Sequence, residues 1–281
     1  MKWGVRRYQN KDGSLTSEGK IRYRSKNVKM RGTSKETNYD HDTNSKDRFK
    51  KKQLQRALLS VAYLNPLPLA FMAADTVKST VAVQKEKKAL KEQAKTLIDK
   101  KTGLHLKPEG KEYTKKEDAK SVNPAYADFS DNTKNNCMLC TTAYDLRRRG
   151  YNVLAKKAST GYDDDIIAHC YPKAKKHVPE QTITKKNGKV VVSKKLMKEN
   201  TKKDLLAQGE GARGNLCVTW DNSFSGHSVA YEVENGKVNI YDAQCGKKMS
   251  LDSILSKSRE CYTYRLDNIE FDKKAIKDAV R

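Results

Sequence analysis

The chain has 281 residues, which is enough for one large domain or two smaller ones. Charged residues make up 33% of the chain and aromatic residues only 7%, which excludes a continuous hydrophobic core along the whole length. The formal net charge is +24, and most of the excess lies in residues 1–120. A chain this basic is attracted to polyanions such as nucleic acid, acidic lipid and acidic protein.

Residues 1–44 are rich in Gly, Ser, Asn and Lys and have no sustained hydrophobic period, so we expect a basic flexible arm. The first ten residues, MKWGVRRYQN, lack the apolar segment of a secretory signal peptide. We therefore expect no export by that route and reduced thiols. Trp3 and Tyr8, beside two arginines, could stack on bases or bind a partner, although the composition favours a solvated tail.

Residues 45–101 are expected to be helical, with Ser45 as the N-cap and Gly103 ending the region. Within them the uncharged segment 57–74 just reaches the ~18 residues of a membrane-span candidate. Pro66 and Pro68 divide this segment, which favours a helical hairpin whose apolar arms pack on each other or on a partner. Residues 102–120 are polar, contain Gly and Pro, and predict a linker.

Residues 121–281 differ in composition from the preceding residues and predict an α+β domain. Three stretches rich in β-branched and aromatic residues predict strands, at 151–155, 215–220 and 261–269. The strongest local prediction is a β-hairpin over 227–243, because two alternating segments flank an Asn-Gly turn. All six cysteines fall in this domain, at positions 137, 140, 170, 217, 245 and 261.

Cys137 is predicted to begin a helix that ends near Gly150, where a glycine suits the C-terminal stop. A thiol at a helix N-terminus faces the positive end of the helix dipole, which favours the nucleophilic thiolate. Nearby unpaired N–H groups could also hold a developing oxyanion. The hairpin would bring His227 and Asp242 close together. A Cys before a helix, then a His and an Asp on successive strands, is the papain-type order of nucleophile, base and orienting residue.

Several separated motifs resemble the papain-fold toxin family of glutamine deamidases, the Tox-PL group, in the version found at the C-terminus of bacteriophage minor head proteins. The resemblance covers about residues 121–275. It rests on Asn136-Cys137-x-x-Cys140, Ala143, Leu146, Arg147, Arg149, Gly150, Tyr151, Val153, Gly226-His227, Asp242, Gln244, Gly246 and the segment RLDNIEF. Ala243 departs from the proline usual in the family. The N-terminal stretch also resembles a module of phage structural proteins.

The resemblance implies a papain-like fold in which the nucleophile helix packs on an antiparallel sheet. It implies that Cys137 is the nucleophile, His227 the base and Asp242 the orienting residue. Asn136 and Gln244 are expected near the site, in substrate binding or the oxyanion hole. The implied reaction hydrolyses a glutamine carboxamide of a protein substrate and needs no cofactor or metal. Virion proteins are implied partners, with nucleic acid or a membrane surface contacted through residues 1–120, and a location in the virion or the bacterial host cytoplasm.

Several alternatives stay open at the level of sequence. Cys140 would be the nucleophile if the helix began three residues later. Cys137 and Cys140 could form half of a zinc site, although no second CxxC follows. The acidic run 163–165 could bind a cation, and Arg147 to Arg149 could bind an acidic partner or belong to the framework.

The function also has alternatives. The chain could be a catalytically silent virion, DNA-associated or membrane-associated structural protein. Within enzymes, a cysteine protease or transglutaminase would use the same thiolate and acyl-enzyme.

Overall fold

The computed structural model describes residues 53–54, 56, 67–128, 133–158, 165–180, 183–186, 189–221 and 225–281. The predicted arm at 1–44 lies outside these ranges, as do much of the apolar segment 57–74 and most of the acidic run 163–165. The described part after residue 44 belongs to one compact unit, residues 45–281.

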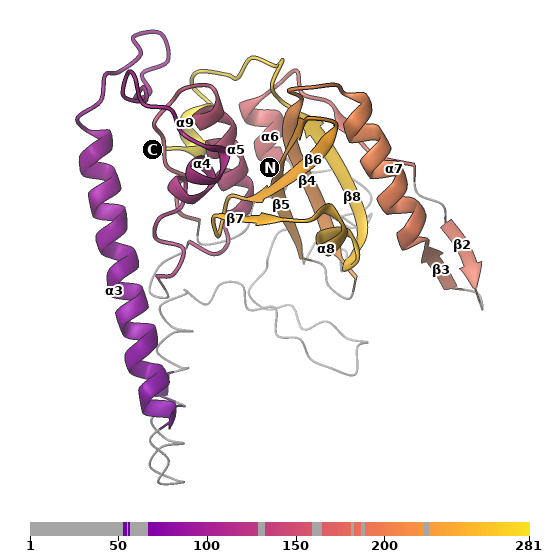
Figure 1. Cartoon of the computed structure of the whole chain (residues 1–281), viewed down its shortest axis with the longest axis horizontal. Coiled ribbons are helices and arrows are strands. Elements are labelled where there is room, and N and C mark those ends of the chain that lie inside the picture. Colours follow the sequence, from indigo (N-terminus) through magenta and orange to yellow (C-terminus); the bar gives the residue numbers. More distant parts are fainter. Residues whose placement is uncertain are drawn as a thin grey trace, which may run out of the picture. The chain divides into compact units, whose positions relative to one another are not determined.

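A six-stranded antiparallel sheet organises this unit, in the order β1-β8-β4-β5-β6-β7 (Figure 1). Its strands are β1 (Lys176–His177), β4 (Arg213–Trp220), β5 (Gly226–Glu234), β6 (Lys237–Asp242), β7 (Lys247–Met249) and β8 (Ser258–Arg265). A separate two-stranded sheet consists of β2 (Ile183–Lys186) and β3 (Lys189–Val192). The α+β class expected from the sequence is confirmed, and the architecture is consistent with a papain-like fold.

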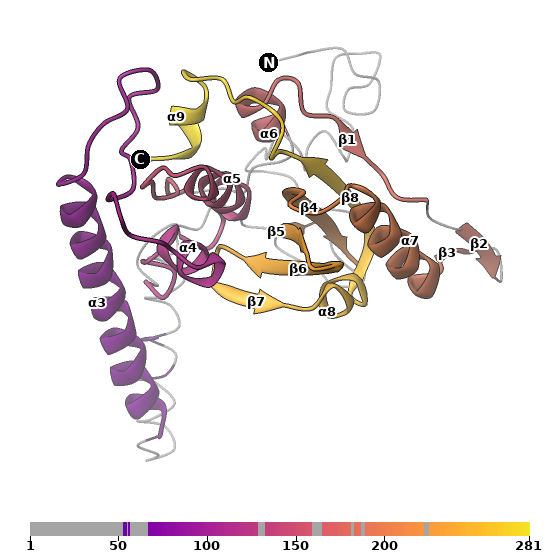
Figure 2. The same cartoon turned by 45° about the horizontal axis from the view of Figure 1, so that its top comes forward.

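The sheet is covered on both faces, because successive side chains of a strand point to opposite sides. On β4, Cys217 joins the core formed with α5 (Cys137–Arg148), whereas Leu216 and Val218 join a second core. That second core includes side chains of α7 (Lys194–Ala207) and α8 (Leu251–Leu255). Figures 1 and 2 show α5 and α7 on opposite sides of the sheet. The sheet is therefore the middle layer of three.

The predicted hairpin is confirmed as β5 and β6, with Glu234 paired to Lys237. Asn235 and Gly236, between them, have φ values of 52° and 67°. Positive φ at both central residues is the conformation of a type I′ turn, whose twist matches that of the flanking strands. The turn therefore sets the register of the two strands.

The helix predicted at Cys137 is confirmed as α5. Gly150 has φ 97°, the left-handed conformation expected just beyond a helix end. Residues 151–155 do not form the expected strand. Although all five are described, only Tyr151 and Ala155 make bridges, each an isolated one, to Leu106 and Val280. The segment 151–155 instead lies between the loop that contains Leu106 and the C-terminal residues that include Val280.

The helical region predicted over 45–101 includes a long helix that ends earlier than expected. Helix α3 (Leu67–Gln93) places Pro68 in its first turn, where the missing N–H costs no intrahelical bond. After Gln93 the chain turns, and the Thr96 hydroxyl donates to the Gln93 carbonyl at 2.7 Å. Among the described residues, no helix is both long and apolar enough to cross a membrane.

The linker predicted over 102–120 is wrong, because this segment is part of the folded unit. Leu104 is buried, and α4 (Lys115–Ser121) begins with a capping box between Thr114 and Glu117. Asp118 of α4 is fully buried. The polar composition misled the prediction, since the polar side chains here bind buried partners.

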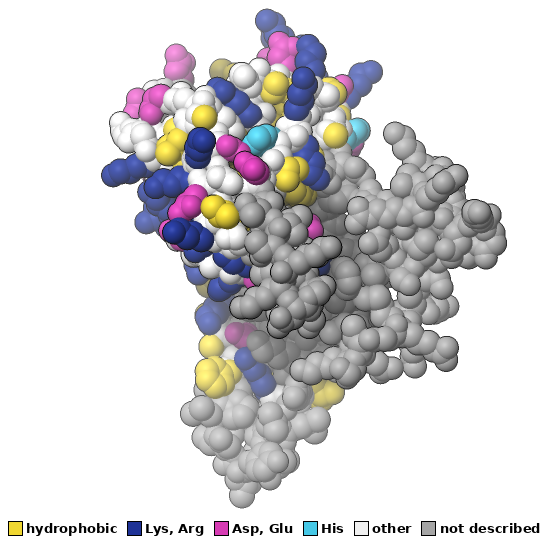
Figure 3. Space-filling view, turned by 90° about the vertical axis from the view of Figure 1, so that its right-hand side faces the viewer, with side chains coloured by type: hydrophobic (Ala, Val, Ile, Leu, Met, Phe, Trp, Pro, Cys, Tyr) yellow, Lys and Arg dark blue, Asp and Glu magenta, His cyan; other side chains and the backbone are white. Residues whose placement is uncertain are grey.

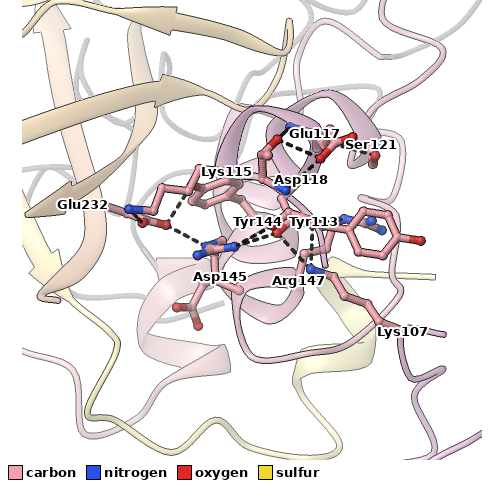
Figure 4. Close-up of polar contacts among 12 residues, drawn as sticks. Lys107, Tyr113, Lys115, Glu117, Asp118, Ser121, Tyr144, Asp145, Arg147 and Glu232 are labelled. Carbon is pink, nitrogen blue, oxygen red and sulfur yellow. Dashed lines mark hydrogen bonds and ion pairs between the residues drawn. The ribbon is translucent and has the colours of Figure 1, made fainter. Parts of the chain in front are cut away.

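Asp118 is the centre of a buried charge network that joins α4 to α5 (Figure 4). Its carboxylate contacts Lys107 at 2.7 Å, Arg147 at 3.1 Å and Arg148 at 3.0 Å. Arg148 also reaches Glu232 on β5 at 3.0 Å. On the same helix, Asp145 pairs with Arg149 at 2.6 Å and with Arg213 of β4 at 2.9 Å. The arginine run at 147–149 therefore belongs to the framework of the domain and not to an acidic-partner site.

Lys and Arg side chains are interspersed with Asp and Glu on the described surface that Figure 3 turns toward the reader. This face therefore presents mixed charge, although the chain as a whole is strongly basic.

Candidate active site

Cys137 is the first residue of α5 and its side chain is half-buried. Within the described residues, the side chain of the N-cap residue Asn136 makes no capping hydrogen bond to the helix. The first N–H groups of a helix have no acceptor inside it. In α5 these groups lie at the end of the helix where Cys137 stands. This end can stabilise negative charge on a thiolate or on a carbonyl oxygen beside it.

His227 lies near the start of β5, beyond the point where β5 and β6 are paired. The last registered pair of these strands is Ala230 with Tyr241. Continuing that register places Asp242 opposite Val229, so His227 is its diagonal neighbour on the same face. The Asp242 Oδ2 atom is 3.0 Å from His227 Nε2. The structure thus brings together a histidine and a carboxylate that are fifteen positions apart.

The Cys137 thiol lies close enough to the imidazole to raise the pKa of His227. Burial alone would lower the pKa of His227, but the interactions with Asp242 and Cys137 outweigh it and raise this pKa to about 10. The ring is therefore held in its charged form at neutral pH.

Trp220 covers one face of the imidazole. The two rings are stacked, with centroids 6.1 Å apart and planes at 22°. This contact contributes to the burial of His227.

The Asp242 carboxylate is held by the turn that follows it. Oδ1 accepts the backbone N–H of Gln244 at 3.0 Å and that of Cys245 at 3.3 Å, while Oδ2 faces His227. Burial would raise the pKa of Asp242, but hydrogen bonds from His227 and from Cys245 hold it below the ordinary value. Asp242 is therefore ionised and oriented before any substrate arrives.

The raised pKa of His227 has a consequence for stability. Because the folded-state pKa lies above the ordinary value of 6.5, charged His227 stabilises the fold fully below about pH 6.5. That contribution is lost as the pH rises through about 10. The lowered pKa of Asp242 acts in the opposite direction, with stability lost only as the pH falls into the acid range.

Asn136 and Gln244 lie beside the triad, but their side-chain amides are bound inside the protein. Asn136 is fully buried and donates from Nδ2 to the Lys156 carbonyl at 2.9 Å. Its Oδ1 accepts from Gln244 Nε2 at 3.3 Å. These contacts favour a positioning role over the substrate contact suggested by the sequence.

Asn123 completes this amide network and was missed by the sequence reasoning. Its Nδ2 lies 2.9 Å from the Gln244 carbonyl, 3.0 Å from that of Thr133 and 3.5 Å from Asn136 Oδ1. It thereby ties the segment before the nucleophile to the turn after Asp242. No local pattern around Asn123 reveals this role, since its partners are 10 to 121 positions away in the chain.

The structure separates the two candidate thiols. Cys140 is fully buried, and burial raises the pKa of its thiol well above the ordinary value. Cys137 is half-buried and faces His227. The geometry therefore favours Cys137 over Cys140 as the reactive thiol.

Two further histidines, His169 and His177, each pair with a separate carboxylate. His169 pairs with Asp278 at 2.9 Å, and His177 with Asp204 at 2.8 Å, both at exposed positions. In the ranges that the structure describes, no group of three or more His, Cys, Asp and Glu side chains could hold a metal ion.

Gly246 controls the turn that holds Asp242, and its replacement should loosen it. Gly246 has φ 72°, and a Cβ there would lie 2.9 Å from the Lys120 Cα of α4. We expect Gly246→Ala to destabilise the protein by more than the about 1–2 kcal/mol of a left-handed alanine. Gly211→Ala is the matched control, because Gly211 has φ 79° but nothing within 4 Å. Equal melting temperatures for the two variants would contradict the importance of the α4 contact.

One comparison with known proteins found a family match. Residues 135–247 match the model of the family described as papain fold toxin 1, glutamine deamidase. This range contains Cys137, His227 and Asp242. No curated protein and no solved structure matches the chain.

Proposed function

We propose that this chain is a cysteine amidohydrolase, because residues 135–247 match the model of the family described as papain fold toxin 1, glutamine deamidase. It converts a glutamine side chain of a target protein into glutamate. The observation that carries the proposal is that His227 lies 3.0 Å from the Asp242 carboxylate and close to the Cys137 thiol at the start of α5. A thiolate, a charged imidazole and an ionised carboxylate in this order are the groups that acyl transfer from an amide requires.

In the first half of the reaction, the Cys137 thiolate attacks the side-chain carboxamide carbon of the target glutamine. The carbonyl oxygen becomes an oxyanion, which the first N–H groups of α5 stabilise. His227 gives its proton to the amide nitrogen. The C–N bond then breaks, and ammonia leaves a thioester between Cys137 and the target side chain.

In the second half, neutral His227 takes a proton from water, and the resulting hydroxide attacks the thioester carbon. The C–S bond breaks, glutamate is released, and Cys137 returns to its thiolate beside charged His227. Asp242 stays ionised throughout and stabilises the imidazolium in each half. The net change is one amide hydrolysed by one water, which adds one negative charge to the target surface.

The predicted phage context stays a prediction. The resemblance to phage structural proteins and the basic arm fall on residues 1–44, outside the described ranges. We propose that the residues before the catalytic domain localise the protein, in the virion or in the bacterial host cytoplasm, while residues 135–247 perform the chemistry.

The reaction class can be tested with a bacterial lysate freed of small molecules as the mixed protein substrate. We expect the full chain to release ammonia and to produce new glutamates at former glutamines in peptide mass maps. His227→Gln should release none above background. Cleaved peptide bonds would assign a protease, and incorporated primary amine a transglutaminase. No His227-dependent change of any kind would favour the catalytically silent structural protein.

A further inference from the structure

Helix α3 lies outside the residues matched by the family. Its buried face nevertheless contacts two segments, one before and one after α5, that support Asn136, the residue before Cys137. Ser79, Glu86 and Gln93 are spaced seven apart and so lie on one face of the helix. Each makes a polar contact with residues that follow α3 in the chain, and Glu86 and Gln93 are buried. Polar contacts of this kind fix the position of the helix on the domain more than they stabilise the fold.

The first contacted segment precedes α5. The Ser79 hydroxyl donates to Asp128 at 2.5 Å, and Asp128 is almost fully buried. Five residues before Asp128 lies Asn123, whose amide reaches Asn136, Thr133 and Gln244. The middle of α3 therefore contacts the segment that supports the amide network beside the nucleophile.

The second contacted segment follows α5. Glu86 binds Lys157 at 2.9 Å and also pairs with Arg281. The carbonyl of Lys156, next to Lys157, accepts from Asn136 at 2.9 Å. Gln93 donates to the carbonyls of Asn152 at 2.8 Å and Arg281 at 3.0 Å. The helix thus contacts both ends of the segment that receives the Asn136 side chain.

The two segments are also joined to each other. The Ala155 N–H donates to the Val122 carbonyl at 2.8 Å, and Arg281 exchanges backbone hydrogen bonds with Leu154 at 2.9 and 3.0 Å. The two segments that support Asn136 are therefore held by α3 and by the last residues of the chain. Neither α3 nor these last residues lie within residues 135–247.

We propose that α3 is a brace for the active site, with Glu86 as its main positioning residue. The brace acts through Lys156 and Asn136 on the position of Cys137 at the N-terminus of α5. It rests on the proposed function, because it assigns Glu86 the task of keeping the Cys137 sulfur in contact with the His227 ring.

The test is the pH profile of alkylation of Cys137 by iodoacetamide in the full chain, followed by mass spectrometry of the peptide that contains it. We expect Glu86→Gln to slow alkylation at neutral pH by at least about tenfold, because small displacements of paired reacting groups are costly. Glu92→Gln is the matched control, because Glu92 is an exposed carboxylate of the same helix.

A second comparison separates positioning from mere stability. If the brace acts through Asn136, Glu86→Gln should have a much smaller effect in an Asn136→Ala background than in the wild type. Ser79→Ala is a milder variant that keeps the test available if Glu86→Gln folds poorly. A lower melting temperature with an unchanged alkylation profile in both α3 variants would overturn the proposal.

Failure of the brace and failure of the proposed function give different results. If His227→Gln leaves the wild-type alkylation profile unchanged, there is no relay, and the brace falls with it. If His227→Gln changes the profile but Glu86→Gln behaves like Glu92→Gln, the relay stands and only the brace is overturned.

Discussion

Replacing Cys137 by alanine should reduce turnover by on the order of a millionfold, the loss seen when a comparable triad loses its nucleophile, whereas Cys140→Ala should retain most of the activity. The difference follows from position on one helix. Cys137 is half-buried beside His227, while Cys140, one turn further, is fully buried and its pKa is raised by burial. Ammonia release from a mixed protein substrate measures both variants.

The two cysteines are controls for each other, because the same atoms are removed from neighbouring turns of α5. Cys140→Ala leaves a small void in the core and should lower the melting temperature. Cys137→Ala should leave the fold intact. An inactive Cys140→Ala variant with a normal circular dichroism spectrum, beside an active Cys137→Ala variant, would show that the wrong sulfur has been assigned.

Asp118→Asn should destabilise the protein by about 3–5 kcal/mol, the typical cost of removing one partner from a buried ion pair. Asp118 is fully buried and contacts three cations, of which Arg147 is itself almost fully buried. Without the carboxylate these cations keep their charge inside the protein without compensation. Urea unfolding gives the loss directly.

Glu112→Gln is the matched control for this charge change, because Glu112 is an exposed residue shortly before α4. It should change stability by less than about 0.5 kcal/mol.

Deleting residues 1–120 removes Asp118 and leaves its buried cations without compensation. We therefore expect this deletion to prevent folding, although the family match begins only at residue 135. A folded deletion variant, or an Asp118→Asn variant as stable as Glu112→Gln, would contradict the role given to α4.

The parts of the fold that could be predicted are those specified by local sequence. Asn235-Gly236 specifies its turn because few residues adopt positive φ at both positions, and the turn in turn places β5 beside β6. Gly150 marks the end of α5 for a similar reason, because its φ is 97°. The pairing of His227 with Asp242 followed from that hairpin, although their contact is diagonal and not directly across the strands.

The parts that could not be predicted depend on distant partners. The segment containing α4 reads as a linker because its charges cannot be matched with Arg147 and Glu232 from sequence alone. Helix α7 lies in a lysine-rich stretch whose few buried residues, Met197 and Leu205 among them, pack on the far face of the sheet. Long-range packing decided both.

The site divides in the same way. Its reacting groups were visible in the order Cys, His, Asp. The supporting groups were not, because Asn123 and Glu86 act through backbone carbonyls and ion pairs far from them in the chain. A family motif cannot reveal a support that lies outside the matched residues.

The central claim is that the Cys137 sulfur lies against a charged His227 ring, and NMR titration of the His227 side chain tests it most directly. The wild-type ring should stay protonated through neutral pH and titrate near pH 10, and Cys137→Ala should lower its pKa because one of the raising contacts is lost. A His227 that titrates near 6.5 in both proteins would contradict the pair and the enzyme built on it.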